Sequence, residues 1–156
     1  MATEADREEP IDPDVDVHVA EQRGELVRTH GAVLLVIALG GGLGALARYA
    51  VGVLLPIGAW ATFGVNVLGC LLIGVLMVLI HEVWSVHRLL RPFIGVGVLG
   101  GFTTFSTYAV EFAGLLRPGS VLPAGLYLVG TVLGALLAVL AGVALTRSIV
   151  GKQVQP

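Results

Sequence analysis

Long apolar stretches separated by short polar connections dominate this chain after residue 30. A helix needs about 20 apolar residues to cross about 30 Å of hydrocarbon. Four stretches reach that length, at residues 31–55, 60–80, 92–116 and 121–146. The pattern predicts a compact all-α integral membrane protein with four transmembrane helices.

The third stretch is interrupted near its centre. Residues 98–108 read Val-Leu-Gly-Gly-Phe-Thr-Thr-Phe-Ser-Thr-Tyr, so two glycines are followed by a cluster of hydroxyl side chains. Glycine is entropically unfavourable in a helix, and clustered Ser and Thr offer the backbone competing hydrogen bonds. Because hydrocarbon supplies no water to an unpaired backbone group, such a segment needs protein, an ion or a cavity around it. We predict a broken third helix whose free carbonyls near residues 100–103 could hold a small hard cation.

Polar and aromatic groups inside the apolar stretches are few, and each is a candidate for function. They are Arg48, Asn66, Phe105, Ser106, Thr107, Tyr108, Glu111, Tyr127 and Thr131. Polar groups within a membrane usually face a helix interior or a water cavity. Asn66 could instead make one structural hydrogen bond between helices, and Arg48 could extend its charge to the interface. Ring edges carry partial positive charge, so rings, hydroxyls and an amide together could replace the hydration shell of a small anion.

The composition supports a membrane protein and argues against an enzyme. Only 13% of the 156 residues are charged, against roughly 25% in soluble domains. The single cysteine, Cys70, excludes an intrachain disulfide and is interpreted as a packing residue. Glycines spaced by four in the first and fourth stretches are typical of close helix packing. Since no nucleophile–base pair or metal-ligand cluster is apparent, we expect no enzyme, and we expect no nucleic-acid partner.

The start of the chain differs in charge from the rest. Residues 1–30 contain nine of the eleven acidic residues and lack the cationic start and short apolar core of a signal peptide. We therefore expect a disordered acidic cytosolic tail over residues 1–30. A four-helix domain over residues 31–147 and a short C-terminal tail over residues 148–156 complete the expected organisation.

Lysine and arginine residues lie mostly on one side of the expected membrane. That side would have Arg7, Arg23, Arg28, Arg88, Arg91, Arg147 and Lys152. The other side would have Arg117 in a loop, with Arg48 near a helix end. Because cytosolic loops are enriched in Lys and Arg, we predict that both termini are cytosolic in an inner or plasma membrane.

Three short motifs follow one another along the first three stretches. They are Gly-Gly-Leu-Gly-Ala-Leu-Ala-Arg-Tyr at residues 41–49, Thr-Phe-Gly-Val-Asn-Val-Leu-Gly at residues 62–69, and the interrupted segment at residues 97–107. Together they resemble the CrcB/Fluc family of small fluoride channels. The resemblance covers residues 31–147, and three motifs in order across four spans make it specific.

The resemblance implies passive, selective export of cytosolic fluoride, which lowers fluoride toxicity. It implies an antiparallel, dual-topology dimer in membrane lipid, with two narrow pores and a central structural sodium ion (Na+). By motif position, backbone carbonyls of Gly100 and Thr103 would bind the sodium ion. Asn66 would donate to fluoride, and Phe105 and Tyr108 would present ring edges. The other lining positions implied are Ser106, Thr107, Glu111, Tyr127, Thr131 and, in an aqueous vestibule, Arg48.

Two positions depart from the usual family pattern. Tyr108 stands where phenylalanine is usual, and Ala135 stands where a hydroxyl is frequent. A phenol could donate to fluoride or obstruct the pore, so a non-conducting structural subunit of a heterodimeric fluoride channel is an alternative. A small multidrug exporter is a weaker alternative, because that class relies on an acidic residue in the first span and residues 31–80 contain none.

The charge bias also bears on the partner. An antiparallel homodimer requires a chain that inserts in both directions, which needs balanced loop charge. We predict that this chain inserts one way and forms a heterodimer with an oppositely oriented paralogue. A homodimer is the alternative, because the arginines of the tail lie among acidic residues.

Overall fold

The computed structural model describes residues 20–83, 88–117 and 119–151. The chain divides into two units between Ala32 and Val33, and the fold below is that of the second unit. Most of the expected acidic tail lies outside the described residues, although helix α1 already begins at Ala20. The division into tail, four-helix domain and C-terminal tail stays a prediction.

The described residues form helices joined by short turns. In chain order they are α1 (Ala20–Leu54), α2 (Ala59–Val78), the π-helical η2 (Leu79–Val83) and η3 (Pro92–Val98), α3 (Leu99–Phe102), α4 (Ser106–Leu115) and α5 (Val121–Val150). Four stretches are long and apolar enough to span a membrane: Gly31–Leu54, Ala59–Val83, Pro92–Leu115 and Val121–Val150. The prediction of four apolar spans is confirmed, with ends a few residues from those expected.

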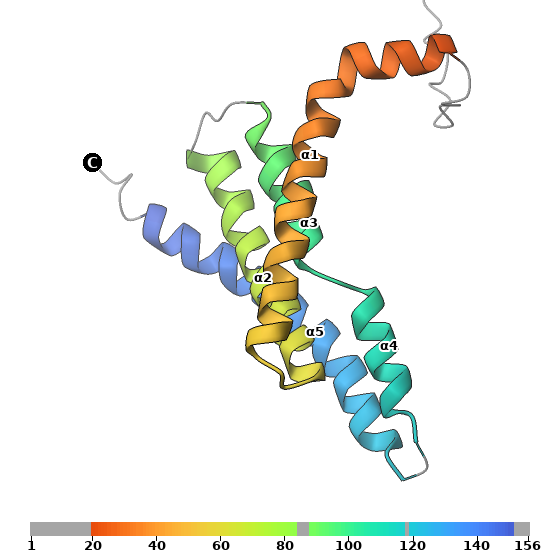
Figure 1. The fold of residues 1–156 in the computed structure, drawn as a ribbon. Coiled ribbons are helices and arrows are strands. Elements are labelled where there is room, and N and C mark those ends of the chain that lie inside the picture. The colour runs from red at the N-terminus through yellow and green to blue at the C-terminus, as the bar shows by residue number, and fades with distance from the viewer. Residues whose placement is uncertain (1–19, 84–87, 118, 152–156) are drawn as a thin grey trace, which may run out of the picture. The chain divides into compact units, whose positions relative to one another are not determined.

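Helices α2 and α5 cross at close range because glycines face backbone at the crossing (Figure 1). A Cβ atom on Gly74 would collide with the Val139 carbonyl of α5, and one on Gly142 would collide with the Leu71 carbonyl of α2. Small residues allow such close approach between membrane helices. The predicted glycine packing is therefore confirmed at Gly142, whereas a Cβ atom on Gly130 would meet open space.

Helix α1 packs on the start of the third span in a similar way. A Cβ atom on Gly44 would collide with the carbonyl of Val98, and one on Gly101 would collide with the carbonyl of Gly41. The backbones of α1 and α3 therefore approach each other with no side chain between them at these points. This contact positions the end of α3, where the candidate site begins.

The backbone leaves the helical path between α3 and α4. Helix α3 ends at Phe102, Thr103 adopts an extended conformation (φ −74°, ψ 157°), and α4 begins at Ser106. Helix α4 then runs beside the N-terminal half of α5 (Figure 1). We call residues 103–105 the linker segment.

Much of the apolar surface of the second unit faces outwards. Leu54 of α1, Val110 of α4 and Leu137 of α5 are each at least 66% exposed, whereas the buried apolar residues are few and include Val65 and Ala124. A water-soluble protein rarely exposes so much contiguous apolar area. The surface is appropriate for lipid or for further membrane helices.

Candidate functional site

Asn66 of α2 holds the linker segment through the nitrogen and the oxygen of its side-chain amide. Its Nδ2 donates to the carbonyl oxygen of Thr104 at 2.9 Å, and its Oδ1 accepts from the amide of Thr104 at 2.8 Å. Asn66 is only 9% exposed, so the pair of hydrogen bonds satisfies a buried amide and a backbone unit that has left the helix. One N–H of the Asn66 amide remains for another acceptor.

Two backbone carbonyls lose their usual helical donors as a result. In a continuous helix the amide of Thr104 would bond the carbonyl of Gly100, and the amide of Thr107 would bond that of Thr103. Here the Thr104 amide bonds Asn66, and the Thr107 amide donates to the hydroxyl of Thr104 at 3.2 Å. Within residues 20–83, 88–117 and 119–151, neither the Gly100 nor the Thr103 carbonyl accepts a hydrogen bond. These two oxygens are suitable ligands for a hard cation.

The guanidinium of Arg48 lies beside the same backbone. Its Nε donates to the carbonyl oxygen of Gly101 at 3.2 Å, which ties the C-terminal part of α1 to the end of α3. Arg48 is part-buried, so its charge lies partly out of solvent. The chain therefore has a fixed positive charge within reach of the linker segment.

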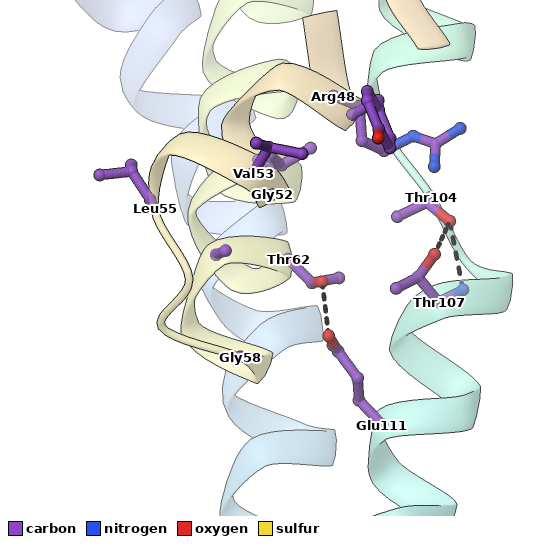
Figure 2. Close-up of a pocket in the computed structure, with 12 residues that line it drawn as sticks. Arg48, Gly52, Val53, Leu55, Gly58, Thr62, Thr104, Thr107 and Glu111 are labelled. Carbon is purple, nitrogen blue, oxygen red and sulfur yellow. Dashed lines mark hydrogen bonds between the residues drawn. The ribbon is translucent and has the colours of Figure 1, made fainter. Parts of the chain in front are cut away.

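A cavity of about 420 Å³ adjoins this charge, and we call it the polar groove. Its polar lining residues are Arg48, Tyr49, Thr62, Thr104, Thr107 and Glu111. Figure 2 shows Arg48 near one end and Glu111 toward the other, with the two threonines of the linker segment and α4 between them.

Hydroxyl groups form a short chain along the polar groove. The Thr104 hydroxyl donates to the Thr107 hydroxyl at 3.1 Å, and Ser106 Oγ lies 3.4 Å from Thr104 Oγ1. A hydroxyl has one proton, so Thr104 has used its own while the proton of Thr107 stays available. Thr107 is therefore the hydroxyl donor best placed to bind an anion in this groove.

Glu111 is held by hydroxyl groups from two neighbouring helices. Thr62 of α2 donates to its Oε1 at 2.9 Å, and Tyr127 of α5 donates to its Oε2 at 2.7 Å. Each carboxylate oxygen thus has one donor, which offsets part of the cost of removing an ionised group from water. This triad links α2, α4 and α5 at one end of the polar groove.

A second cavity, of about 330 Å³, adjoins the linker segment, and we call it the aromatic groove. Its lining includes Asn66, Cys70, Thr103, Phe105, Tyr108, Thr131 and Ala135. The rings of Phe105 and Tyr108 are 5.7 Å apart between centroids, and those of Tyr108 and Tyr127 are 5.5 Å apart. Both separations are typical of interacting aromatic pairs.

Two hydroxyl groups on the wall of the aromatic groove donate hydrogen bonds to backbone carbonyls. Thr131 donates to the carbonyl of Tyr127 at 2.7 Å, and Tyr108 donates to that of Leu128 at 2.7 Å. A ligand in this groove would meet ring edges and the remaining Asn66 N–H rather than these hydroxyls. Ala135 contributes a methyl group to the wall and no donor.

The structure thus places most of the residues selected from the sequence in or beside two grooves that share Thr104. Arg48, Thr107 and Glu111 line the polar groove, and Ser106 and Tyr127 are bonded to members of that set. Asn66, Phe105, Tyr108 and Thr131 line the aromatic groove. The Thr103 carbonyl belongs to the linker segment, and the Gly100 carbonyl precedes it in α3. Sequence reasoning missed Thr62, Thr104 and the Leu128 carbonyl as site groups. Thr62 precedes Asn66 by one helical turn, and that spacing is a signal that could have identified it.

Comparison with known proteins gives a consistent result. A family model described as "CrcB-like protein, Camphor Resistance (CrcB)" matches residues 35–143. A protein of Nocardia farcinica named fluoride-specific ion channel FluC 2 is 59% identical over 120 residues, covering 74% of this chain and 86% of its own length. Fluoride-specific ion channel FluC 1 of Streptomyces coelicolor is 58% identical, covering 72% of this chain and 75% of its own length. FluC 2 of Streptomyces avermitilis is 48% identical, covering 77% of this chain and 78% of its own length.

Proposed function

Because this chain belongs to the CrcB-like protein family, we propose that it is a multi-pass membrane protein that forms a passive, fluoride-selective channel. Relatives that are about half identical over most of this chain are named as fluoride-specific ion channels. The channel would let cytosolic fluoride leave the cell and so lower its toxicity. An interior-negative potential favours exit of an anion by about 2.3 kcal/mol per charge per 100 mV.

The observation that carries the proposal is the linker segment clamped by Asn66 between two grooves. A broken third span at this point gives a small anion polar contacts at a depth where lipid offers none. We infer that fluoride exchanges its water for the second Asn66 N–H, the Thr107 hydroxyl and the ring edges of Phe105 and Tyr108. These partners are neutral, so they replace hydration without trapping the ion by full charge.

The charged groups of the polar groove would act at the entrance. Arg48 would raise the local concentration of anions, as a fixed positive charge in a low-dielectric cleft does. Glu111 would repel anions, but the hydrogen bonds that it accepts from the hydroxyls of Thr62 and Tyr127 would offset part of its negative charge. We assign Ser106, Tyr127 and Thr131 to the wall of the passage. There Ser106 would position the Thr104 hydroxyl and Tyr127 would position Glu111. Thr131 bonds the Tyr127 carbonyl within α5.

The carbonyls of Gly100 and Thr103 would hold a sodium ion. The support is that neither oxygen has a hydrogen-bond donor in the part of the chain that the structure describes. Hard cations such as Ca²⁺ and Mg²⁺ take about six or more oxygen ligands, so two carbonyls need others from a second protomer or from water. When bound, the ion would add positive charge and link the linker segments of two chains.

We further propose an antiparallel dimer with the termini of this chain in the cytosol. The charge bias of the loops favours one direction of insertion, so the oppositely oriented protomer would be a paralogue. Streptomyces avermitilis has proteins named fluoride-specific ion channel FluC 2 and FluC 3, which shows that one organism can hold more than one such relative.

Fluoride efflux from liposomes tests this proposal. The purified chain is reconstituted alone and with its paralogue, and a fluoride electrode and a chloride electrode record release when a potassium ionophore sets the membrane potential. We expect release of fluoride well above that of chloride, strongest with both proteins present. If neither preparation releases fluoride faster than protein-free liposomes, the proposed function is wrong. If the chain alone gives full activity as an antiparallel dimer, the heterodimer is wrong.

A further inference from the structure

Gly69 of α2 lies directly against the linker segment. It is buried and follows Asn66 by one helical turn, so the two residues share a face of the helix. A Cβ atom on Gly69 would collide with the methyl carbon Cγ2 of Thr103, whereas it would lie 3.5 Å from Cδ1 of Phe102, an ordinary contact. The missing side chain of Gly69 therefore leaves a space on α2, which we call the glycine notch, and the Thr103 methyl group fills it.

The other branch of the Thr103 side chain is held by α3. Its hydroxyl donates to the carbonyl oxygen of Leu99 at 3.0 Å, and the Thr103 amide donates to the same oxygen at 3.0 Å. The methyl and the hydroxyl of threonine rotate together about the Cα–Cβ bond, so a rotation that withdrew the methyl from the notch would also break the hydroxyl bond. Thr103 is therefore fixed between α2 and α3 at the point where the backbone leaves the helix.

The contacts with α2 also determine where the Thr103 carbonyl lies. That carbonyl shares a peptide unit with the amide of Thr104, and the C=O and N–H of a trans peptide point in opposite directions. Since the Thr104 N–H donates to Asn66 Oδ1 at 2.8 Å, the Thr103 carbonyl points away from Asn66. Asn66 thus sets the direction of the carbonyl, and Gly69 sets how close the Thr103 backbone lies to α2.

We propose that Gly69 is a positioning residue for the sodium site, because the glycine notch sets the position of the Thr103 carbonyl oxygen that the ion would bind. The inference rests on the proposed function, of which this cation site is a part. Gly69→Ala would force Thr103 out of its rotamer or push the linker segment away from α2. Both movements would displace an oxygen ligand, and residues that support the ligands of a metal tune its affinity.

Sodium-dependent thermal unfolding tests the inference without transport. An ion that binds only the folded protein raises the unfolding temperature once its concentration exceeds its dissociation constant. The full chain, with its paralogue if the two purify together, is unfolded in detergent over a series of sodium chloride concentrations, and N-methylglucamine chloride keeps the ionic strength constant. We expect Gly69→Ala to raise the half-saturating sodium concentration on the order of tenfold, the change that one side chain forced off its rotamer produces. An unchanged half-saturating concentration would overturn the inference.

A second substitution shows whether the loss acts through Thr103. Thr103→Ser removes Cγ2 and keeps the hydroxyl that bonds Leu99, so it makes room for an alanine methyl at position 69. We expect the double variant Gly69→Ala/Thr103→Ser to recover most of the sodium affinity that Gly69→Ala loses. No recovery would contradict the proposal. If Gly69→Ala alone does not fold, the double variant should fold and depend on sodium, and a double variant that also fails to fold would contradict the proposal.

Gly64→Ala is the matched control. Gly64 lies on the same helix and is exposed, and a Cβ atom there would meet open space. We expect this variant to keep the sodium dependence of the parent, and a loss equal to that of Gly69→Ala would overturn the role of the notch. A parent whose unfolding temperature does not respond to sodium would overturn the cation site together with this inference. Fluoride efflux from the same parent then decides separately whether the chain forms a channel.

Discussion

The two grooves on either side of Thr104 satisfy their polar groups in different ways. In the polar groove, side chains of different helices bond one another, as Thr62 and Tyr127 do with Glu111, and Thr107 keeps a free hydroxyl proton. In the aromatic groove, the protons of Tyr108 and Thr131 are given to backbone carbonyls of α5. The difference indicates that the two grooves act at different steps of anion passage. The polar groove is suited to attracting a hydrated anion, and the aromatic groove to holding a dehydrated one by ring edges and one amide.

The largest effect should come from the amide that joins both grooves. In Asn66→Asp the carboxylate still accepts from the Thr104 amide but loses the donor to the Thr104 carbonyl and adds a negative charge in the passage. Two like charges about 6 Å apart at an effective dielectric constant of about 20 repel each other by about 2.8 kcal/mol, so we expect fluoride efflux to fall on the order of a hundredfold.

Asn66→Ala serves as the comparison for this effect. It removes the clamp without adding charge, so the difference between the two variants isolates electrostatic repulsion. Both proteins should elute as the parent does in gel filtration. Efflux from Asn66→Asp liposomes at the parental rate would show that the anion passes elsewhere.

An intermediate effect should follow from removing the charge of the polar groove. Arg48→Ala should lower fluoride efflux about tenfold at low ionic strength and less at high ionic strength, because salt screens an attractive field. Arg48→Lys should retain most of the flux, since it keeps the charge but not the Nε donor to Gly101. Arg117→Ala, an exposed position outside both grooves, is the control and should behave as the parent does. Equal loss in the Ala and Lys variants would mean that Arg48 acts by bonding α3 rather than by charge.

The smallest effect on fluoride flux should come from the wall of the polar groove, where we expect a substitution to change mainly the stability of the protein. Thr62→Val leaves one oxygen of Glu111 without its donor and should lower the free energy of unfolding by about 1–3 kcal/mol. Thr146→Val is the matched control, because the buried Thr146 hydroxyl bonds only the Gly142 carbonyl of its own helix. Thermal unfolding in detergent measures both. Equal stability of the two variants would argue against a structural role for the Thr62–Glu111 bond.

The sequence allowed the spans and many of the polar and aromatic groups that line the two grooves to be predicted, because each has a local signal. Length and apolarity define the spans, and a polar group such as Asn66 or Glu111 stands out in an apolar stretch. The partners of these groups carry no such signal. The Tyr108 hydroxyl bonds the Leu128 carbonyl, and every residue has a carbonyl, so only the geometry of α4 against α5 selects that one. The same holds for the Arg48 bond to Gly101.

Glycine packing illustrates the same limit. The repeat of small residues in α5 extends over several turns, yet a Cβ atom would collide with backbone at Gly142 and meet open space at Gly130. The repeat shows which face of α5 carries small side chains. The point at which α2 crosses that face depends on the angle between α2 and α5. Composition along one helix contains no information on that angle.

A crystal structure of the protein grown with sodium fluoride, with its paralogue if required, tests the central claim most directly. We predict that Asn66 bonds both backbone groups of Thr104, that a cation contacts the Gly100 and Thr103 carbonyls, and that an anion lies against the edge of the Phe105 ring. A third span that is helical throughout, with the Thr104 amide bonded to the Gly100 carbonyl and Asn66 facing lipid, would contradict the account.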